Sequence, residues 1–364
     1  MNDAIVRDEY GSPAMKHRRA VMTRVVVTRH GGPEVLQVVE GDRPEPRVGE
    51  VRVRVLAAGV SAYDTMLRRH ALPGDQRVPF TLGADVVGVV DKLGEGVSTV
   101  EPGQGVAGAT FSLDGLGGYA EFICLPASEL VPVPPEVDPA EAVCVVVNYL
   151  TAHMALHRVA DVRSGERVLV HGAAGGVGTA LLQLGRLAGL EMYGTASKHN
   201  HELVSALGAT PIDYRAEDFV ERIRGLTGDG VDVVFDPIGG ARQLWRSYRA
   251  LRKGGRLVWF GVAATKKEGL RVIPLTMLMV ALLKLIPDGK RTPLFPDLGE
   301  DKAWYRATLT ELLDSLAAGR IKPVVAKRIP LAEAARAHEL LERGGYAGKV
   351  VLVAGAYRAG KESG

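Results

Sequence analysis

A glycine-rich loop between an apolar strand and a helix constrains the fold of this chain more than any other feature. Residues 168–178 read VLVHGAAGGVG, and the helical pattern TALLQLGRLAG follows directly. In the GxGxxG pattern of dinucleotide loops, the first glycine position is expected to make the turn, the second to admit a pyrophosphate, and the third to let the helix pack closely. These three positions are Ala173, Gly175 and Gly178. The residues expected to hold the pyrophosphate at the helix start are Ala173, Ala174, Gly175, Gly176, Val177 and Gly178.

Strands and helices alternate after the loop. The strand patterns VLVHG, MYGTA, PIDY, VDVVFD and GRLVWFG are separated by helical patterns. This succession predicts an α/β fold with a doubly wound parallel sheet. Residues 25–130 differ, because short Val-rich strands separated by Gly and Pro predict an antiparallel, barrel-like domain. Asp138 and Pro139 are expected to start a helix between the two parts.

The end of the second strand decides between NADP and NAD. NAD-binding folds place an Asp or Glu about 20 residues past the loop, where it binds the adenosine ribose hydroxyl. Here the stretch reads TASKHN, and the first acid is Glu202. Ser197 and Lys198 offer a hydroxyl and an ammonium group that suit a 2'-phosphate, so we expect NADPH. The alternative is that Ser197 caps a helix and Lys198 is a solvated charge.

Charge and cysteine content argue against several classes of function. The formal net charge of +3 over 364 residues is too small a surplus for a nucleic-acid or anionic-membrane binder. Two cysteines without CxxC spacing fit a reducing cytoplasm. Residues 1–20 lack periodicity and a signal-peptide pattern, so we expect a disordered extension. The apolar stretch Val272–Leu283 is too short for a membrane span and is expected in a core, a subunit contact or over a substrate pocket.

Longer motifs connect the chain to a known family. They are GGPEVLQV, GVSAYDTMLRR, PFTLGADVVGVVDKLGEGV, GGYAEF, NYLTAH, HGAAGGVGTALLQL, IDYRAEDF and VDVVFDPIGG. Over residues 22–355 these resemble the medium-chain dehydrogenase/reductase superfamily, within its zinc-free quinone oxidoreductase, zeta-crystallin-like branch. The resemblance implies a GroES-like β-rich catalytic domain and a Rossmann domain. The expected parts are an extension at 1–20, the catalytic domain at 21–148, the Rossmann NADP-binding domain at 149–295, a return to the catalytic domain at 296–355, and a tail at 356–364.

The zinc-ligand positions of this superfamily are changed here. Its zinc alcohol dehydrogenases use a Cys in the segment matching GVSAYD, and a His and a Glu in the segment matching GADVVG. This chain has Ser61, Ala84 and Asp85 at those positions. Without a thiolate or an imidazole we expect no catalytic zinc. Residues 108–122 contain no cysteine, so a four-cysteine structural zinc lobe is not expected either.

The resemblance also implies roles for individual residues. Tyr214 would join Ser197 and Lys198 at the adenosine phosphate, and the nicotinamide would be held by Thr151, Phe260 and Gly261.

The catalytic segment GVSAYDTM departs from the family's GVNxxDxY, with Ser61 for the usual asparagine and Met66 for a frequent tyrosine. Ser61 and Tyr63 are the nearest neutral donors, Tyr63 can deliver a proton, and Asp64 is expected to be a structural acceptor.

These residues favour one reaction. Reducing a simple carbonyl without a Lewis acid is difficult, whereas a quinone or enone spreads the developing charge, which one or two donors can stabilise. We therefore expect an NADPH-dependent reductase of a small quinone or α,β-unsaturated carbonyl compound. We also expect a homodimer or a dimer of dimers, from the apolar stretch Val272–Leu283 and the habit of the family.

Two other functions stay open. A 2-enoyl thioester reductase usually carries a tyrosine in a GxYP segment, where residues 70–73 here read HALP. A nucleotide-bound structural or RNA-binding role ranks lower, because aromatic and basic residues do not alternate.

Overall fold

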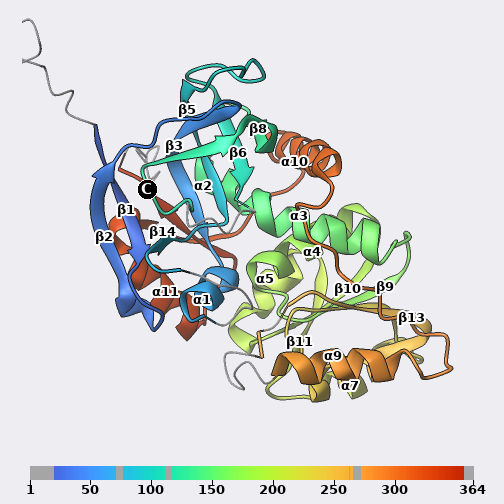
Figure 1. Cartoon of the computed structure of the whole chain (residues 1–364). Coiled ribbons are helices and arrows are strands. Elements are labelled where there is room, and N and C mark those ends of the chain that lie inside the picture. The colour runs from blue at the N-terminus through green and yellow to red at the C-terminus, as the bar shows by residue number, and fades with distance from the viewer. Residues whose placement is uncertain (1–19, 71–76, 111–116, 262, 265–271, 356–364) are drawn as a thin grey trace, which may run out of the picture.

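The computed structural model describes residues 20–70, 77–110, 117–261, 263–264 and 272–355. It forms two lobes, a β-rich one and one built on a parallel sheet (Figure 1). The expected C-terminal tail, and all but the last residue of the expected N-terminal extension, lie outside the described residues.

The parallel sheet has the strand order β11-β10-β9-β12-β13, and every adjacent pair runs parallel. The central strand has an unbroken apolar sequence, since Val168, Leu169 and Val170 are all fully buried between the helix layers. The predicted doubly wound sheet is thereby confirmed. The strands are β9 Arg167–Val170, β10 Glu191–Ala196, β11 Ala209–Asp213, β12 Val231–Asp236 and β13 Leu251–Trp259. The helices of this lobe are α4 Gly176–Leu187, η5 Lys198–Asn200, α5 His201–Ala206, α6 Phe219–Thr227, α7 Ala241–Ala250 and α9 Val272–Leu283.

The β-rich lobe contains a seven-stranded sheet with the order β14-β15-β3-β5-β6-β8, in which β7 also pairs with β3, and a three-stranded sheet β2-β1-β4. Its strands are β1 Val21–Val27, β2 Leu36–Asp42, β3 Glu50–Val60, β4 Phe80–Thr81, β5 Asp85–Leu93, β6 Gly105–Ala109, β7 Phe122–Pro126, β8 Leu130–Pro132, β14 Val325–Pro330 and β15 Lys349–Val353. The helices are α1 Ala62–Arg68, α10 Lys302–Ala317 and α11 Ala334–Arg343, with short turns η1 Pro33–Val35, η2 Ala127–Glu129 and η6 Leu331–Glu333. Because β15 pairs antiparallel with β3, the C-terminal strand lies within the sheet of the N-terminal half. The limits of the domains themselves stay a prediction.

A continuous helical run connects the lobes. It consists of α2 Pro139–Cys144, η3 Val145–Tyr149, α3 Leu150–His153 and η4 Met154–Val159. The predicted start is correct, since the Asp138 carboxylate accepts hydrogen bonds from the N–H groups of Ala140 and Glu141. By length and composition this run could cross a membrane, but 78% of its most apolar window is buried inside the fold. A core helix passes the same test, so the run is weak support for a membrane span.

The beginning of β15 attaches the catalytic lobe to the glycine-rich loop. The Gly348 N–H donates to the Ala174 carbonyl at 2.8 Å, and Gly348 forms a parallel bridge with Gly175. A second attachment links Gln183 on α4 to the backbone of Lys322. The Lys322 N–H donates to the Gln183 Oε1 at 2.7 Å, and the Gln183 Nε2 donates to the Lys322 carbonyl at 2.9 Å. The loop is therefore held by both lobes.

Candidate active site

The glycine-rich loop has the local geometry that a pyrophosphate requires. Gly175 is the N-cap of α4 and is exposed to solvent, and no side chain caps the first N–H groups of the helix. A Cβ on Gly178 would collide with the Gly172 carbonyl oxygen, which explains why a glycine stands there. The position of the turn differs from the expectation, which assigned it to Ala173. Gly172, with φ of 63°, makes the left-handed turn, whereas Ala173 is fully buried.

Two hydroxyl groups meet at the edge of the sheet beside the loop. Ser197 follows β10 and Tyr214 follows β11, and because these parallel strands are neighbours, their ends come together. The Ser197 Oγ lies 3.3 Å from the Tyr214 hydroxyl. Ser197 makes no side-chain capping bond, so the alternative role as a helix cap is not realised. Lys198 is exposed beside this pair.

Arg215 is a residue that sequence reasoning missed at this position. Its guanidinium lies 5.6 Å from the centre of the Tyr214 ring. The signal was present in the segment IDYR, where a cation follows the tyrosine directly. Each hydroxyl residue is thus directly followed in the chain by a cation, Lys198 or Arg215, and β10 ends without a carboxylate.

A buried polar network fixes the strand ends under the loop. His171 lies 3.1 Å from both Thr195 Oγ1 and Ser247 Oγ, and Ser247 donates to the Asp236 carboxylate at 2.7 Å. Asp236 also accepts the N–H groups of Ile238 and Gly239. Burial lowers the pKa of His171, so the ring is neutral at pH 7 and serves as a structural link. The partners of His171 lie on other elements, so no signal in the sequence alone indicates this role.

The residues expected at the nicotinamide come from the helical run and from the end of β13. Thr151 is buried in α3, one turn after Asn148. The Asn148 amide occupies the space where Gly176 would carry a side chain, so this helix packs directly against the loop. Phe260 contacts Phe295 with ring centres 5.8 Å apart, and a Cβ on Gly261 would crowd Pro237. The joint action of Thr151, Phe260 and Gly261 on a nicotinamide stays a prediction.

Asp64 is a buried structural acceptor at the start of α1. Its carboxylate accepts from the Ser61 N–H at 2.8 Å, from the Ser61 Oγ at 2.6 Å, and from the Gly83 N–H at 3.0 Å. Burial is the main cause that raises the pKa of Asp64 to about 6, and the hydrogen bond from Ser61 opposes it. Because the Ser61 hydroxyl donates its hydrogen bond to this carboxylate, it is less available as a donor to a substrate.

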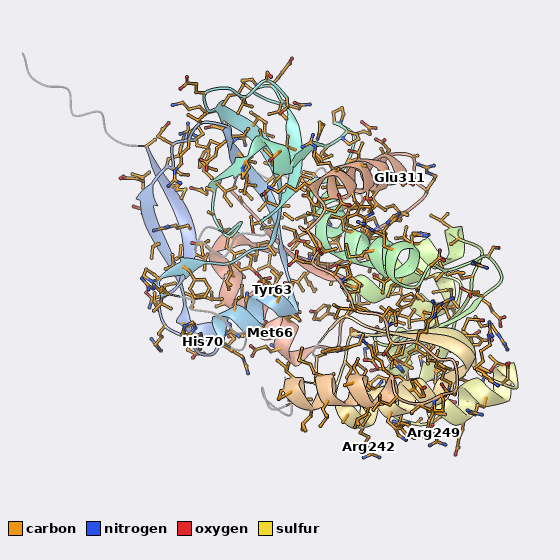
Figure 2. All side chains as sticks on the ribbon, turned by 45° about the vertical axis from the view of Figure 1, so that its right-hand side comes forward. Tyr63, Met66, His70, Arg242, Arg249 and Glu311 are labelled. Carbon is orange, nitrogen blue, oxygen red and sulfur yellow. The ribbon has the colours of Figure 1, made fainter. Side chains whose placement is uncertain are left out.

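Tyr63 is the more available donor. It is 42% exposed, and Figure 2 shows it on α1 beside Met66. Burial of part of the ring, together with the charges of Asp64 and Asp297, raises the pKa of Tyr63, which keeps the phenol protonated at pH 7. Asp297 belongs to the stretch that follows α9, so the phenol lies within electrostatic reach of a segment outside its own helix. The two predicted donors therefore differ: the Ser61 hydroxyl is bonded to Asp64, whereas Tyr63 is partly exposed.

Comparisons with known proteins agree with this arrangement. The family model described as zinc-binding dehydrogenase matches residues 207–352, and that described as alcohol dehydrogenase GroES-like domain matches residues 47–135. Human quinone oxidoreductase is 31% identical over 339 residues, covering 92% of this chain and 98% of the relative. The chain belongs to the medium-chain dehydrogenase/reductase superfamily. Within it, the chain falls in the zinc-free quinone oxidoreductase branch.

Other members of the superfamily are similarly close. The rat synaptic vesicle membrane protein VAT-1 homolog is 33% identical over 343 residues, 91% of this chain and 84% of the relative. The structure of Escherichia coli quinone oxidoreductase complexed with NADPH superposes with a TM-score of 0.82 at 30% identity, covering 91% of this chain and 99% of that one. The structure of mycobacterial Rv1454c complexed with NADPH gives 0.79 at 33% identity, covering 91% and 100%.

One of the three zinc-ligand positions, Asp85, forms a buried ion pair with Lys349 in this chain. Lys349 Nζ lies 2.7 Å from Asp85 Oδ2 and 3.5 Å from Asn148 Oδ1, and both charged side chains are almost fully buried. Burial alone would lower the pKa of Lys349, but the Asp85 charge raises it above its ordinary value. A Cβ on Gly59 would collide with both partners, so a glycine in β3 makes room for the pair. Among the described residues, no three His, Cys, Asp or Glu side chains gather as a metal site.

We predict that Lys349→Met destabilises the protein by about 3 to 5 kcal/mol, because it leaves Asp85 buried without a counter-charge. The double variant Lys349→Met/Asp85→Leu should recover most of this loss, which thermal and urea unfolding would measure. Arg336→Ala, which breaks an exposed pair with Glu333, is the control and should cost less than about 1 kcal/mol. Equal losses in the single and double variants would show that packing and not charge explains the effect.

Proposed function

We propose that this protein is an NADPH-dependent, zinc-independent reductase that transfers hydride to a quinone or an α,β-unsaturated carbonyl compound. The observation that carries the proposal is the pair of hydroxyls from Ser197 and Tyr214, 3.3 Å apart, each directly followed in the sequence by a cation, Lys198 or Arg215. Such a group fits a 2'-phosphate, which accepts several hydrogen bonds and carries negative charge. Quinone oxidoreductase relatives and neighbours solved with NADPH agree with it.

The residues present fit the whole of NADPH. Residues 173–178 offer a loop held at both ends, with Gly175 open at the helix start for the pyrophosphate. Thr151, Phe260 and Gly261 are proposed to hold the nicotinamide. When bound, NADPH supplies the hydride. The protein orients it, and Tyr63 donates a hydrogen bond to the oxygen on which negative charge develops.

A conjugated acceptor suits these donors better than a simple ketone does. Charge in an enolate or a hydroquinone anion is delocalised, so a single phenol stabilises it adequately. The positions that hold zinc ligands in related dehydrogenases carry Ser61, Ala84 and Asp85, and Lys349 already neutralises the last of these. These side chains therefore do not offer a Lewis acid a ligand set.

Measurement of NADPH oxidation over quinones, enones, enoyl thioesters and simple aldehydes tests the proposal. Preference for enoyl thioesters would favour the second candidate, a partner in fatty-acid or polyketide synthesis. The GxYP comparison at residues 70–73 falls mostly outside the described residues, so it rests on sequence alone. RNA binding in a gel-shift assay without any reductase activity would favour the third candidate. For location we propose the cytoplasm, which suits the two free cysteines, Cys124 and Cys144.

Tyr63→Phe should lower kcat by about a hundredfold with little change in KM, because the phenol acts as the charge develops. Steady-state kinetics with a reactive quinone or enone would measure this. Tyr193→Phe is a matched control, since its hydroxyl bonds Glu191 at the start of β10 and should leave kcat unchanged. An unchanged kcat in Tyr63→Phe would transfer the donor role to Ser61 or to water.

Lys198→Ala should weaken NADPH by about ten- to a hundredfold and leave NADH nearly unaffected, as expected for the loss of a charge-assisted hydrogen bond. Arg215→Ala should act in the same direction. The effect should appear in KM, because the 2'-phosphate binds alike in ground and transition states. Lys302→Ala on α10 is the control. Equal losses of affinity for NADPH and NADH, or a wild-type preference for NADH, would show that Lys198 and Arg215 do not bind the 2'-phosphate.

We also propose a homodimer that covers α9. Leu275, Met277 and Leu278 on this helix are 54%, 59% and 56% exposed, an unusual density of apolar side chains facing water. Light scattering should give twice the chain mass at micromolar concentration, and Leu278→Glu should shift the protein toward the monomer. Leu226→Glu on α6, where the leucine is 40% exposed, is the control. A monomeric wild type would contradict the proposal.

A further inference from the structure

A cavity of about 380 Å³ lies at the outer edge of the parallel sheet, apart from the glycine-rich loop. It is bounded by the end of η4, by β13, by the residue after α9, and by residues 290–293. Its walls contain four cations, Arg256, Lys284, Lys290 and Arg291, and one carboxylate, Asp161. None of the residues assigned to the cofactor or to catalysis lines it.

The backbone forces two of these arginines together. The Leu257 N–H donates to the Arg291 carbonyl, and the Arg291 N–H donates to the Gly255 carbonyl, each at 2.9 Å. Arg256 and Arg291 are therefore register partners in a parallel bridge on the edge of the sheet. Like charges placed opposite each other on adjacent strands repel, so nearby anions favour this arrangement.

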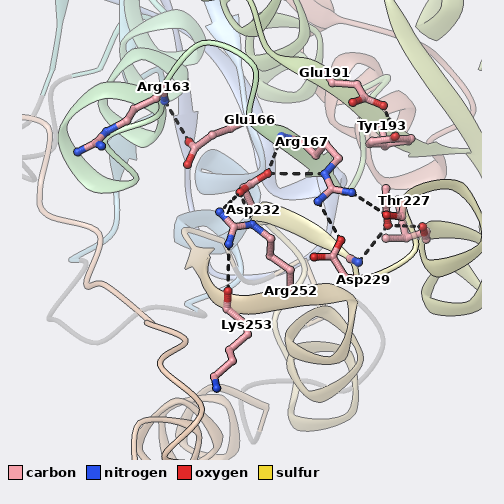
Figure 3. Close-up of polar contacts among 12 residues, drawn as sticks. Arg163, Glu166, Arg167, Glu191, Tyr193, Thr227, Asp229, Asp232, Arg252 and Lys253 are labelled. Carbon is pink, nitrogen blue, oxygen red and sulfur yellow. Dashed lines mark hydrogen bonds and ion pairs between the residues drawn. The ribbon is translucent and has the colours of Figure 1, made fainter.

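Carboxylates of the protein balance only part of this charge. Arg256 pairs with Glu166, and Lys290 pairs with Asp288 at 3.3 Å. For Lys284 and Arg291, both exposed, no ion pair is found among the described residues. Two other arginines of this lobe, by contrast, are paired with carboxylates, as Figure 3 shows. Arg167 donates to Asp229, and Arg252 donates to Asp232.

Two buried donors at the cavity also lack partners. Within the described part of the chain, the Arg256 Nε and the Thr292 Oγ1 are buried and have no hydrogen-bond partner. Thr292 is only 6% exposed. Buried donors in native proteins are nearly always satisfied, so each of these two donors calls for an acceptor that the described residues do not supply.

We infer that this cavity is a second anion site, which binds a small phosphate monoester. The cavity wall offers three kinds of donor group: the guanidinium groups of Arg256 and Arg291, the hydroxyl of Thr292, and the ammonium groups of Lys284 and Lys290. A phosphate group, with three terminal oxygens and up to two negative charges, satisfies more of them than a planar carboxylate does. The volume lies at the lower end of the range of about 300 to 1,000 Å³ for small-molecule sites, which leaves room for a compact organic body. The inference does not depend on the proposed reductase activity.

Calorimetric titration with inorganic phosphate tests the site, using the full chain at constant ionic strength with sodium chloride as the compensating salt. The titration is run with and without saturating NADPH, so that the 2'-phosphate and pyrophosphate positions are occupied in one arm. We expect one phosphate per chain in both arms. Arg291→Ala should raise the Kd about ten- to a hundredfold, as for loss of a charge-assisted bond. Lys253→Ala, an exposed cation on β13 outside the cavity wall, should leave the Kd unchanged.

Thr292→Val gives a second test that does not depend on the charge. It keeps the shape of the side chain and removes a hydroxyl without a partner, so the phosphate-free variant should melt no lower than the wild type. Its Kd for phosphate should rise, and its Tm should rise less than that of the wild type when phosphate is added. Phosphate heats no larger than those of chloride, loss of phosphate binding when NADPH is present, or equal affinity in Arg291→Ala and wild type would each overturn the inference.

Discussion

The buried ion pair between Lys349 and Asp85 lies inside the catalytic lobe, next to the backbone contact that joins this lobe to the glycine-rich loop. Lys349 follows Gly348, whose N–H holds the glycine-rich loop, and its ammonium reaches back to β5 of the catalytic lobe. Neither charge tolerates burial without the other. The pair therefore ties the start of β15 to β5, one residue after the Gly348 N–H that contacts the loop. Asn148, 3.5 Å from the same ammonium, extends this constraint to the helical run that carries Thr151.

The two charges of this ion pair also act on the carboxyl group of Asp64. Asp85 raises and Lys349 lowers the pKa of Asp64, but burial dominates and brings it to about 6 from an ordinary 3.8. The folded state thus holds this proton more tightly than the unfolded chain does. Ionisation of Asp64 costs stability as the pH rises from about 4 to about 6, and the cost stays constant above that range. Near neutral pH the carboxylate is charged, and the hydrogen bonds from Ser61 and Gly83 partly compensate for its burial.

Sequence patterns predicted the parallel sheet, the glycine-rich loop and the capped helix after Asp138, because each depends on neighbours along the chain. The pattern also indicated Ser197 and Lys198, which follow a strand. Contacts between distant segments were not visible. Nothing near Lys349 in the sequence shows that it meets Asp85, and Arg256 and Arg291 become neighbours only when an irregular segment adds to the edge of the sheet. His171 was missed for the same reason, since its partners Thr195 and Ser247 lie on other elements.

The loop itself departs from its consensus in a way that the sheet explains. Ala173 stands where the pattern has a glycine, and the structure moves the left-handed turn back to Gly172. Ala173 is then free to adopt a conformation suited to a side chain, and its N–H donates to the Thr195 carbonyl at 3.0 Å. Its methyl group points at β10, where a Cβ on Gly194 would lie only 2.6 Å away. The alanine in the loop is thus accommodated by a glycine in the neighbouring strand. The Ala173 methyl group fills a space that has no room for a second methyl group on residue 194.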